Sequence, residues 1–297
     1  MSAHGESLDE RLTSQPRGDR IQGRLFQFAM LMSLAVGIVS LATLIIQVLV
    51  KGSGRLNTDV LTQFPSGLPD NAGAQSAIFG TLWVIGIVAL VTIPIGVGAA
   101  IYLEEYADRE RWWNRAIELN IQNLAAVPSI VYGILGLAFL VRGFANLGQT
   151  VLAGALTLSL LVMPIVIISA REAIRAVPNS IRQGSYALGA TQWQTIRRQV
   201  LPGAIPGMAT GSILALSRAI GEAAPLVLLG ALTFITFNPE GLDSAFTVLP
   251  IQIFNWISRP QEEFKVLAAA AIIVLLVILL AMNATAVYLR NRFQRKW

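Results

Sequence analysis

Six long, nearly uncharged apolar runs set the strongest limit on what this chain can fold into. They cover residues 25–50, 77–103, 119–141, 151–170, 205–237 and 266–289. A helix needs roughly 20 apolar residues to cross a hydrocarbon core about 30 Å thick, and each run is long enough. The short alternating pattern of outer-membrane strands is not seen. The sequence therefore predicts an all-α membrane protein with six transmembrane helices.

Composition agrees with this class and argues against enzyme chemistry. Hydrophobic residues make up 54% of the chain, charged residues 13%, and the mean hydropathy is +0.62. There is no cysteine for a disulfide or a thiolate metal site, and the single histidine is His4. The stretch "GFANLGQT" has the length of a phosphate-binding loop, but Gln149 replaces its lysine. We expect no catalytic site, and no cofactor or metal held by this chain.

The positions of Lys and Arg predict the orientation. With the N-terminus in the cytoplasm, sixteen basic residues fall inside and five outside. This bias places both termini in the cytoplasm. The same bias accounts for the net charge of +5, because the excess of basic residues marks the cytoplasmic side. We therefore expect no nucleic-acid partner. We divide the chain into a flexible cytoplasmic tail (1–24), a six-helix transmembrane domain (25–290) and a basic cytoplasmic tail (291–297).

The remaining basic residue lies inside the fifth run, in "ALSRAIGEAAP". Arg218 and Glu222 are four residues apart and so share a helix face. Arg218 lies sixteen residues after Pro202, which is roughly 24 Å along the segment and near mid-membrane. A charge at that depth costs about 2.5–3.5 kcal/mol on insertion scales. We expect the pair to face protein or a water-filled cavity, either lining a pathway or forming a structural ion pair. Pro225 is expected to break the helix just beyond it.

Small residues recur at every fourth position from Gly203 into the same run. This pattern lets another helix approach closely. The residues are Gly203, Gly207, Gly211, Ala215 and Ala219.

The third run has a similar interruption in "AVPSIVYG". Pro128 removes a helical hydrogen bond, and Ser129 and Tyr132 add polar groups at membrane depth. A pathway role and a plain proline kink both remain open. Arg171, at the cytoplasmic end of the fourth run, is either an exit contact or a positive-inside anchor.

The longest cytoplasmic connection, about residues 171–202, is predicted to form two helical pieces. The first continues to Leu188, the chain breaks at Gly189, and Leu201-Pro202 ends the second. Trp193 is expected to be exposed among Gln and Arg, either as part of a docking element or at the lipid headgroups.

Within this connection, "ALGATQWQTIRRQVLP" resembles the loop of permease subunits of binding-protein-dependent ABC importers. Gly189 and Leu201-Pro202 match that motif, whereas Gln183-Gly184-Ser185 stands where Glu-Ala-Ala is usual and Gln199 where Ile is common. The resemblance implies a type I ABC importer permease (MetI-like) fold. It also implies that the loop seats in a groove of an ATPase, with the contact made by Ala187, Gly189, Ala190, Thr191, Trp193, Leu201 and Pro202.

Three further stretches, "AAVPSIVYGILGLAFLVR", "ALSRAIGEAAPL" and "FNWISRPQEEFKVLAAAAIIVLL", are similar to PstA-type permeases of phosphate importers. That family implies alternating access in a bacterial inner membrane. Its partners are a PstC-type permease, two PstB-type ATPase subunits that bind ATP and Mg²⁺, and a PstS-type phosphate-binding protein. The resemblance implies inorganic phosphate as substrate, and we expect the pathway to include Arg218, Glu222, Ser129, Tyr132 and Arg171.

Three other readings stay open. One is a permease for sulfate, molybdate or phosphonate. Another is an ATP-independent channel or secondary transporter, which predicts inverted repeats that we do not see. The third is a membrane anchor, which leaves the charges of Arg218 and Glu222 unexplained.

Overall fold

The computed structural model describes residues 17–108, 110–231 and 234–293. Residues 1–50 and 51–297 form two separate compact units. The described residues form helices and one isolated β-bridge, between Thr150 and Ala245. Five helices are long and apolar enough to cross a membrane, and a bent pair makes a sixth candidate span. The predicted all-α class with six candidate spans is confirmed.

The first candidate span lies in α2 (Arg17–Ser53). This helix begins at Arg17, inside the stretch 1–24 that the sequence predicted as a flexible tail. A polar segment can continue a membrane helix into water because the helix satisfies its own backbone there. His4 lies outside the described residues.

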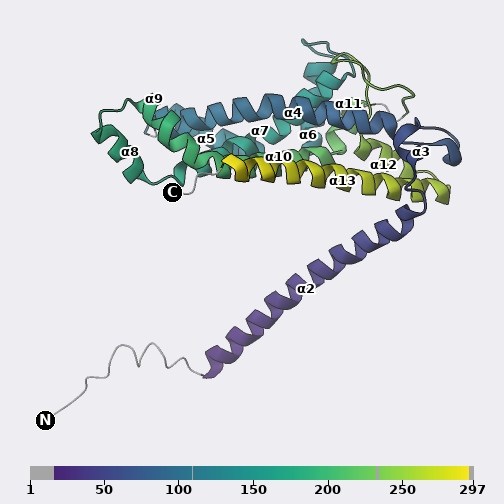
Figure 1. The fold of residues 1–297 in the computed structure, drawn as a ribbon, viewed down its shortest axis with the longest axis horizontal. Coiled ribbons are helices and arrows are strands. Elements are labelled where there is room, and N and C mark those ends of the chain that lie inside the picture. Colours follow the sequence, from purple (N-terminus) through teal and green to yellow (C-terminus); the bar gives the residue numbers. More distant parts are fainter. Residues whose placement is uncertain (1–16, 109, 232–233, 294–297) are drawn as a thin grey trace. The chain divides into compact units, whose positions relative to one another are not determined.

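The second unit is built on long helices that run along one another (Figure 1). The central helix α7 (Val151–Arg175) packs on both α4 (Gln75–Ile101) and α10 (Leu201–Gly221), and α13 (Glu262–Phe293) packs on α10. Their buried faces form one apolar core that includes Val88, Leu158 and Ala219. α13 continues past the predicted boundary at 290, and residues 294–297 lie outside the described residues.

Short helices connect and cap these long ones. They are α3 (Thr58–Thr62), η1 (Pro69–Asn71), α5 (Trp112–Ala125), α6 (Ser129–Leu135), α8 (Asn179–Ala187), α9 (Gln192–Thr195), α11 (Ala224–Leu229) and α12 (Leu249–Ile257). Three wide π-helical turns continue α4, α6 and α9, namely η2 (Tyr102–Tyr106), η3 (Gly136–Val141) and η4 (Ile196–Val200).

The third and fifth runs are not single straight spans. At Pro128 the chain turns by 105° between α5 and the helix that follows. The fifth run was predicted to continue to residue 237, but α10 ends at Gly221 and only the short α11 follows. Each break lies beside a proline, which lacks the N–H that would continue the helix.

The connection at about residues 171–202, which the sequence predicts to be cytoplasmic, also differs from its predicted structure. Its first helical piece is interrupted at Pro178, so α7 and α8 are separate helices. Its second piece does not end at Leu201-Pro202, because the helix is continuous from Gln192 to Gly221. The wide turn η4 precedes Pro202 and alters the hydrogen-bond register there, so the missing N–H costs little.

A second core lies at the end of the unit formed by α3, α12 and the start of α13. Trp256 and Phe264 are fully buried in it, and Val60 and Leu249 pack around them. Trp256 is therefore a core residue, whereas Phe254, two residues before it, is exposed. This core fixes the ends of α4 and α13 against each other.

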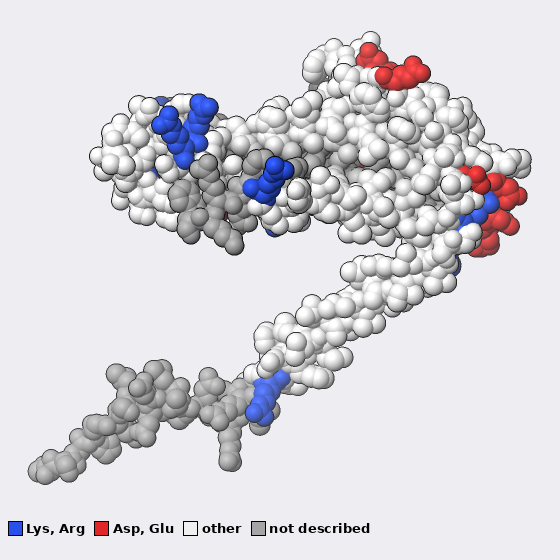
Figure 2. All heavy atoms as spheres, viewed as in Figure 1, with Lys and Arg blue, Asp and Glu red and all other residues white. Residues whose placement is uncertain are grey.

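Charged side chains lie mainly towards the two ends of the unit formed by residues 51–297. Figure 2 shows blue basic side chains towards the end with α8 and α9, red acidic side chains together with some blue ones near the opposite end, and an almost uncharged middle. Arg197 and Arg198 belong to the first end, and Glu262, Glu263 and Lys265 to the second. Such a pattern fits a protein whose middle lies in lipid.

Candidate functional site

The first candidate site is the interruption between α10 and α11. Gly221 ends α10, Glu222 has an extended backbone (φ −81°, ψ 112°), and Pro225 lies in the first turn of α11. Arg218 Nε donates to Glu222 Oε1 at 3.3 Å. The two side chains thus form the predicted pair, but the break lies at Glu222 itself and not after the pair at Pro225.

The pair lies on an open side of the unit. The Arg218 side chain is 46% exposed and that of Glu222 is 19% exposed. Among the described residues, the Arg218 guanidinium makes no other hydrogen bond or ion pair. A guanidinium with free donors can bind an anion through two parallel hydrogen bonds.

The bent third span packs against this interruption. Gly133 of α6 lies so close to α11 that a Cβ there would be 2.7 Å from the Cα atom of Pro225. Tyr132 is buried, and its hydroxyl donates to the carbonyl of Leu124 at 2.8 Å, across the break at Pro128. Ser129 begins α6 one turn earlier. The structure thus brings α6 to the Arg218 region, while the Tyr132 hydroxyl is used to hold the bend.

A polar link missed from the sequence lies beside Arg218. Ser217 Oγ donates to Asn283 Oδ1 of α13 at 2.8 Å. A hydrogen bond between two helices at membrane depth stabilises their packing by about 1 kcal/mol. An isolated Asn in an apolar run was the available signal, and its partner on another helix is not visible from the sequence.

The small-residue face of α10 packs on α7. A Cβ at Gly207 would lie 2.6 Å from the Cβ of Ala173, and a Cβ at Gly211 would overlap Ser169. Ala215 and Ala219 are buried on the same face. The predicted close approach is present, and α7 is the helix that makes it.

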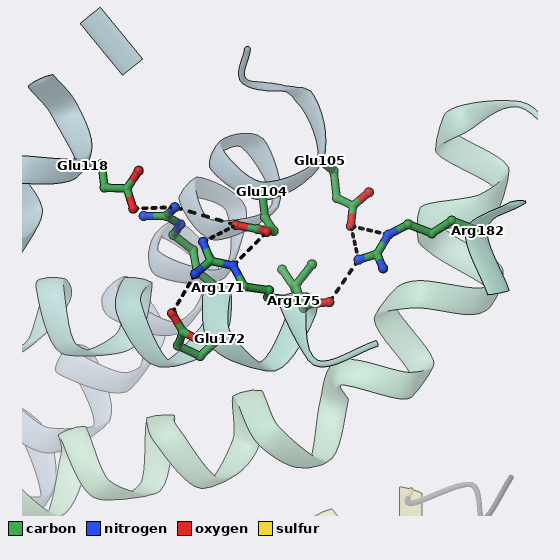
Figure 3. A network of polar contacts seen from close by, with 8 residues as sticks. Glu104, Glu105, Glu118, Arg171, Glu172, Arg175 and Arg182 are labelled. Atoms are coloured by element: carbon green, nitrogen blue, oxygen red, sulfur yellow. Dashed lines mark hydrogen bonds and ion pairs between the residues drawn. The ribbon is translucent and has the colours of Figure 1, made fainter. Parts of the chain in front are cut away.

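Arg171 lies away from Arg218, in a network of ion pairs at the end of α7 (Figure 3). Its side chain is 7% exposed, and its Nη2 is 3.0 Å from Glu118 and 3.6 Å from Glu104. Arg175 also pairs with Glu104, at 3.1 Å. With two carboxylates beside it, Arg171 joins α7 to α5 and η2, and its role as an exit contact stays a prediction.

A cavity of about 270 Å³ adjoins this network and is lined by Arg171, Glu118, Arg115 and Asn114, among others. Arg171 Nε and Asn114 Oδ1 are buried there without a partner among the described residues. Buried polar atoms of this kind are normally satisfied by water.

The second candidate site is the corner between α8 and α9. Gly189 has a φ of +79°, a left-handed conformation that favours glycine. Thr191 then caps α9, since its hydroxyl accepts from Gln194 N and the Gln194 side chain accepts from Thr191 N. Ser185 Oγ and Thr195 Oγ1, 2.8 Å apart, close the corner.

Large apolar side chains project from this corner. Leu188 is 90% exposed and Trp193 is 52% exposed. Ala187 is exposed beside them and Ala190 is half-buried, whereas Leu201 and Pro202 lie in the first turn of α10, beyond η4. Exposed apolar side chains gathered at one corner of a protein are typical of a docking surface.

The chain was compared with protein families, curated proteins and solved structures. Residues 92–295 match the family described as binding-protein-dependent transport system inner membrane component. The phosphate transport system permease protein PstA of Haemophilus influenzae is 31% identical over 266 residues, which is 89% of this chain and 91% of that protein. The probable ABC transporter permease protein YqgI of Bacillus subtilis is 32% identical over 238 residues, covering 80% and 77% of the two chains.

Two solved structures have a similar fold. A bacterial alginate ABC transporter matches with a TM-score of 0.68 and 18% identity over 95% of this chain and 99% of that chain. The MetNI methionine ABC transporter matches with a TM-score of 0.61 and 15% identity over 74% and 95%. At these identities the likeness concerns the fold alone.

Proposed function

Because the chain belongs to the family of inner membrane components of binding-protein-dependent transport systems, we propose that it is the permease subunit of an ATP-driven importer of inorganic phosphate. Such a chain is a transporter subunit and not an enzyme, since a separate ATPase hydrolyses ATP. The assignment of phosphate as the substrate is based on relatives named as phosphate permeases, including those of Haemophilus influenzae and Mycobacterium tuberculosis. The proposed location is the inner membrane of a bacterium.

The observation that carries the proposal is the half-exposed guanidinium of Arg218 at the interrupted helix. Phosphate bears one to two negative charges, and an arginine at mid-membrane depth offers it paired donors. An arginine alone would hold the anion too firmly to release it. The Glu222 carboxylate, 3.3 Å from Arg218 Nε, competes with phosphate for the same guanidinium. This competition lowers the affinity for phosphate and so allows its release.

The corner between α8 and α9 is the proposed contact with the ATPase. Its apolar residues Leu188 and Trp193 are exposed, and it lies at the end where Figure 2 shows Lys and Arg gathered. Basic residues favour the cytoplasmic side, which supports a cytoplasmic location for this corner and for both termini. The proposed partners are a PstC-type permease, two PstB-type ATPase subunits carrying ATP and Mg²⁺, and a PstS-type binding protein.

The test is uptake of labelled phosphate at micromolar concentration in cells with the chain deleted and then restored. Uptake of sulfate and molybdate serves as the control. Loss and recovery of phosphate uptake alone supports the proposal. Unchanged phosphate uptake with failure of another anion would keep the permease and overturn the substrate.

A further inference from the structure

A narrow apolar groove runs between α4, α10 and α13. Its volume is about 350 Å³, and its walls include Ile93, Val97, Met208, Ala209 and Ala286. Arg290 is the only charged residue among the residues that line it. The lining of the groove is therefore apolar apart from one guanidinium, that of Arg290.

The Arg290 guanidinium has spare hydrogen-bond donors. Its Nη1 donates to Thr210 Oγ1 at 3.0 Å, and its Nε and Nη2 donate to Asn291 Oδ1 at 3.3 and 3.2 Å. An arginine has five N–H groups, so about two remain. Among the described residues no carboxylate pairs with it. The bonds to Thr210 and Asn291 fix the group while its positive charge stays uncompensated.

Arg290 lies at the depth of lipid headgroups. The charges of α13 are at its two ends, with Glu263 in the first turn and Arg290 and Arg292 in the last. Glu263 and Arg290 are 27 residues apart, which is about 40 Å of helix. That length matches the ~40–45 Å between the outer limits of the two headgroup layers. An anionic headgroup would meet Arg290, and its acyl chain would extend towards the membrane centre along the groove.

The groove faces away from the Arg218 site. Ala209 and Arg218 are nine residues apart on α10, or about two and a half turns, so they point to opposite sides of the helix. A ligand in the groove therefore lies outside the proposed pathway.

The lining of the groove suits an acyl chain. Its α10 wall runs from Ile205 to Leu216, about 16 Å of helix, and every side chain that α10 contributes to the lining except Ser212 is apolar. A hydrocarbon chain needs no hydrogen-bond partner, so it can lie along this wall.

We propose that this groove is a binding site for an anionic phospholipid, with an acyl chain between α4, α10 and α13 and the phosphate on Arg290. Basic pockets between transmembrane helices at headgroup depth bind anionic lipids through the same combination of charge and apolar contact. The inference does not depend on which substrate is transported.

Lipid binding is measured on the full chain, purified from its membrane with its accompanying subunits, delipidated and titrated with phosphatidylglycerol or phosphatidylcholine. Native mass spectrometry counts the lipids retained. The unaltered chain is expected to retain one phosphatidylglycerol in preference to phosphatidylcholine. Arg290→Gln should weaken this preference about fivefold, the effect of removing one basic contact. Arg142→Gln, which removes an exposed arginine elsewhere, should change nothing.

A second variant tests the acyl-chain site without altering charge. Ala209→Leu fills the groove and should lower retention of phosphatidylglycerol while Arg290 is intact. Equal retention of both lipids, or equal retention by Arg290→Gln and Arg142→Gln, would overturn the proposal. A photoreactive residue at position 209 that crosslinks to a protein helix and not to lipid would also overturn it, because the occupant would then be protein.

Discussion

Arg182 of α8 and Glu105 of η2 form an ion pair of 2.7 Å in which the two side chains are only 14% and 6% exposed. The same guanidinium donates to the carbonyls of Ile174 and Val177, at 3.0 and 2.6 Å. One side chain therefore joins the corner helix α8 to the end of α7 and to the end of the α4–η2 helix (Figure 3). This residue therefore links the α8–α9 corner to two of the candidate spans.

Removing this pair should loosen the corner. Arg182→Gln leaves the Glu105 carboxylate buried without its cation and removes donors from two carbonyls. Breaking a buried pair in this way costs about 3 kcal/mol. We expect a lower melting temperature of the purified chain and a large loss of phosphate uptake.

The control for Arg182 is the exposed Arg197, because Arg197→Gln removes the same charge without breaking a buried pair. A double-mutant cycle with Glu105→Gln measures the coupling of the pair. If Arg182→Gln and Arg197→Gln behaved alike, the pair would not hold the corner.

Local patterns predicted the features that depend on neighbours in sequence. The apolar runs identified the spans, the four-residue spacing identified the Arg218–Glu222 pair, and Gly189 marked the break in the corner. Each depends on helix geometry or on the backbone freedom of glycine. These features lie within one element or one turn.

The prolines show that a residue's local effect on the backbone does not by itself determine whether a helix continues. Pro94, Pro164 and Pro206 lie inside helices that continue, whereas the chain turns by 105° at Pro128. All four lack the same N–H. The turn at Pro128 is spanned by the Tyr132–Leu124 hydrogen bond and packed against α11, where Gly133 meets Pro225. No window around Pro128 contains Pro225.

The ion-pair network was missed for the same reason. Glu104 and Arg171 are 67 residues apart in sequence and meet only because α4 and α7 pack side by side. The sequence showed acidic residues near one span end and arginines near another. It did not show which of them would be buried together.

Changes at the Arg218 site should separate binding from release. Arg218→Gln removes the cation and is expected to abolish phosphate uptake while the chain still assembles. Glu222→Gln removes the competing carboxylate, so we expect a lower apparent KM for phosphate and slower maximal uptake. Initial rates over a range of phosphate concentrations distinguish the two effects. Normal uptake by Arg218→Gln would refute a pathway role for the guanidinium.

The contact between α10 and α7 should not tolerate a methyl group. In Gly211→Ala the new Cβ overlaps Ser169, and such overpacking costs typically about 1–3 kcal/mol. Gly98→Ala, on α4, meets nothing within 4 Å and should be neutral or slightly stabilising. Melting temperatures of the two purified variants test this. An equal effect at both positions would mean that α10 and α7 pack less closely than described.

The corner between α8 and α9 should depend on the backbone of Gly189 and not on its lack of a side chain. A Cβ there meets nothing within 4 Å, but the residue has φ of +79°, where alanine is strained by about 1–2 kcal/mol. Gly189→Ala is therefore expected to shift the angle between α8 and α9 and to lower phosphate uptake. Gly184→Ala, on the same exposed surface but inside α8, should leave uptake intact and raise helix stability by roughly 0.5–1 kcal/mol. Because both variants add one methyl group to one surface, a difference between them isolates the shape of the corner. Equal uptake would show that docking does not require this backbone conformation.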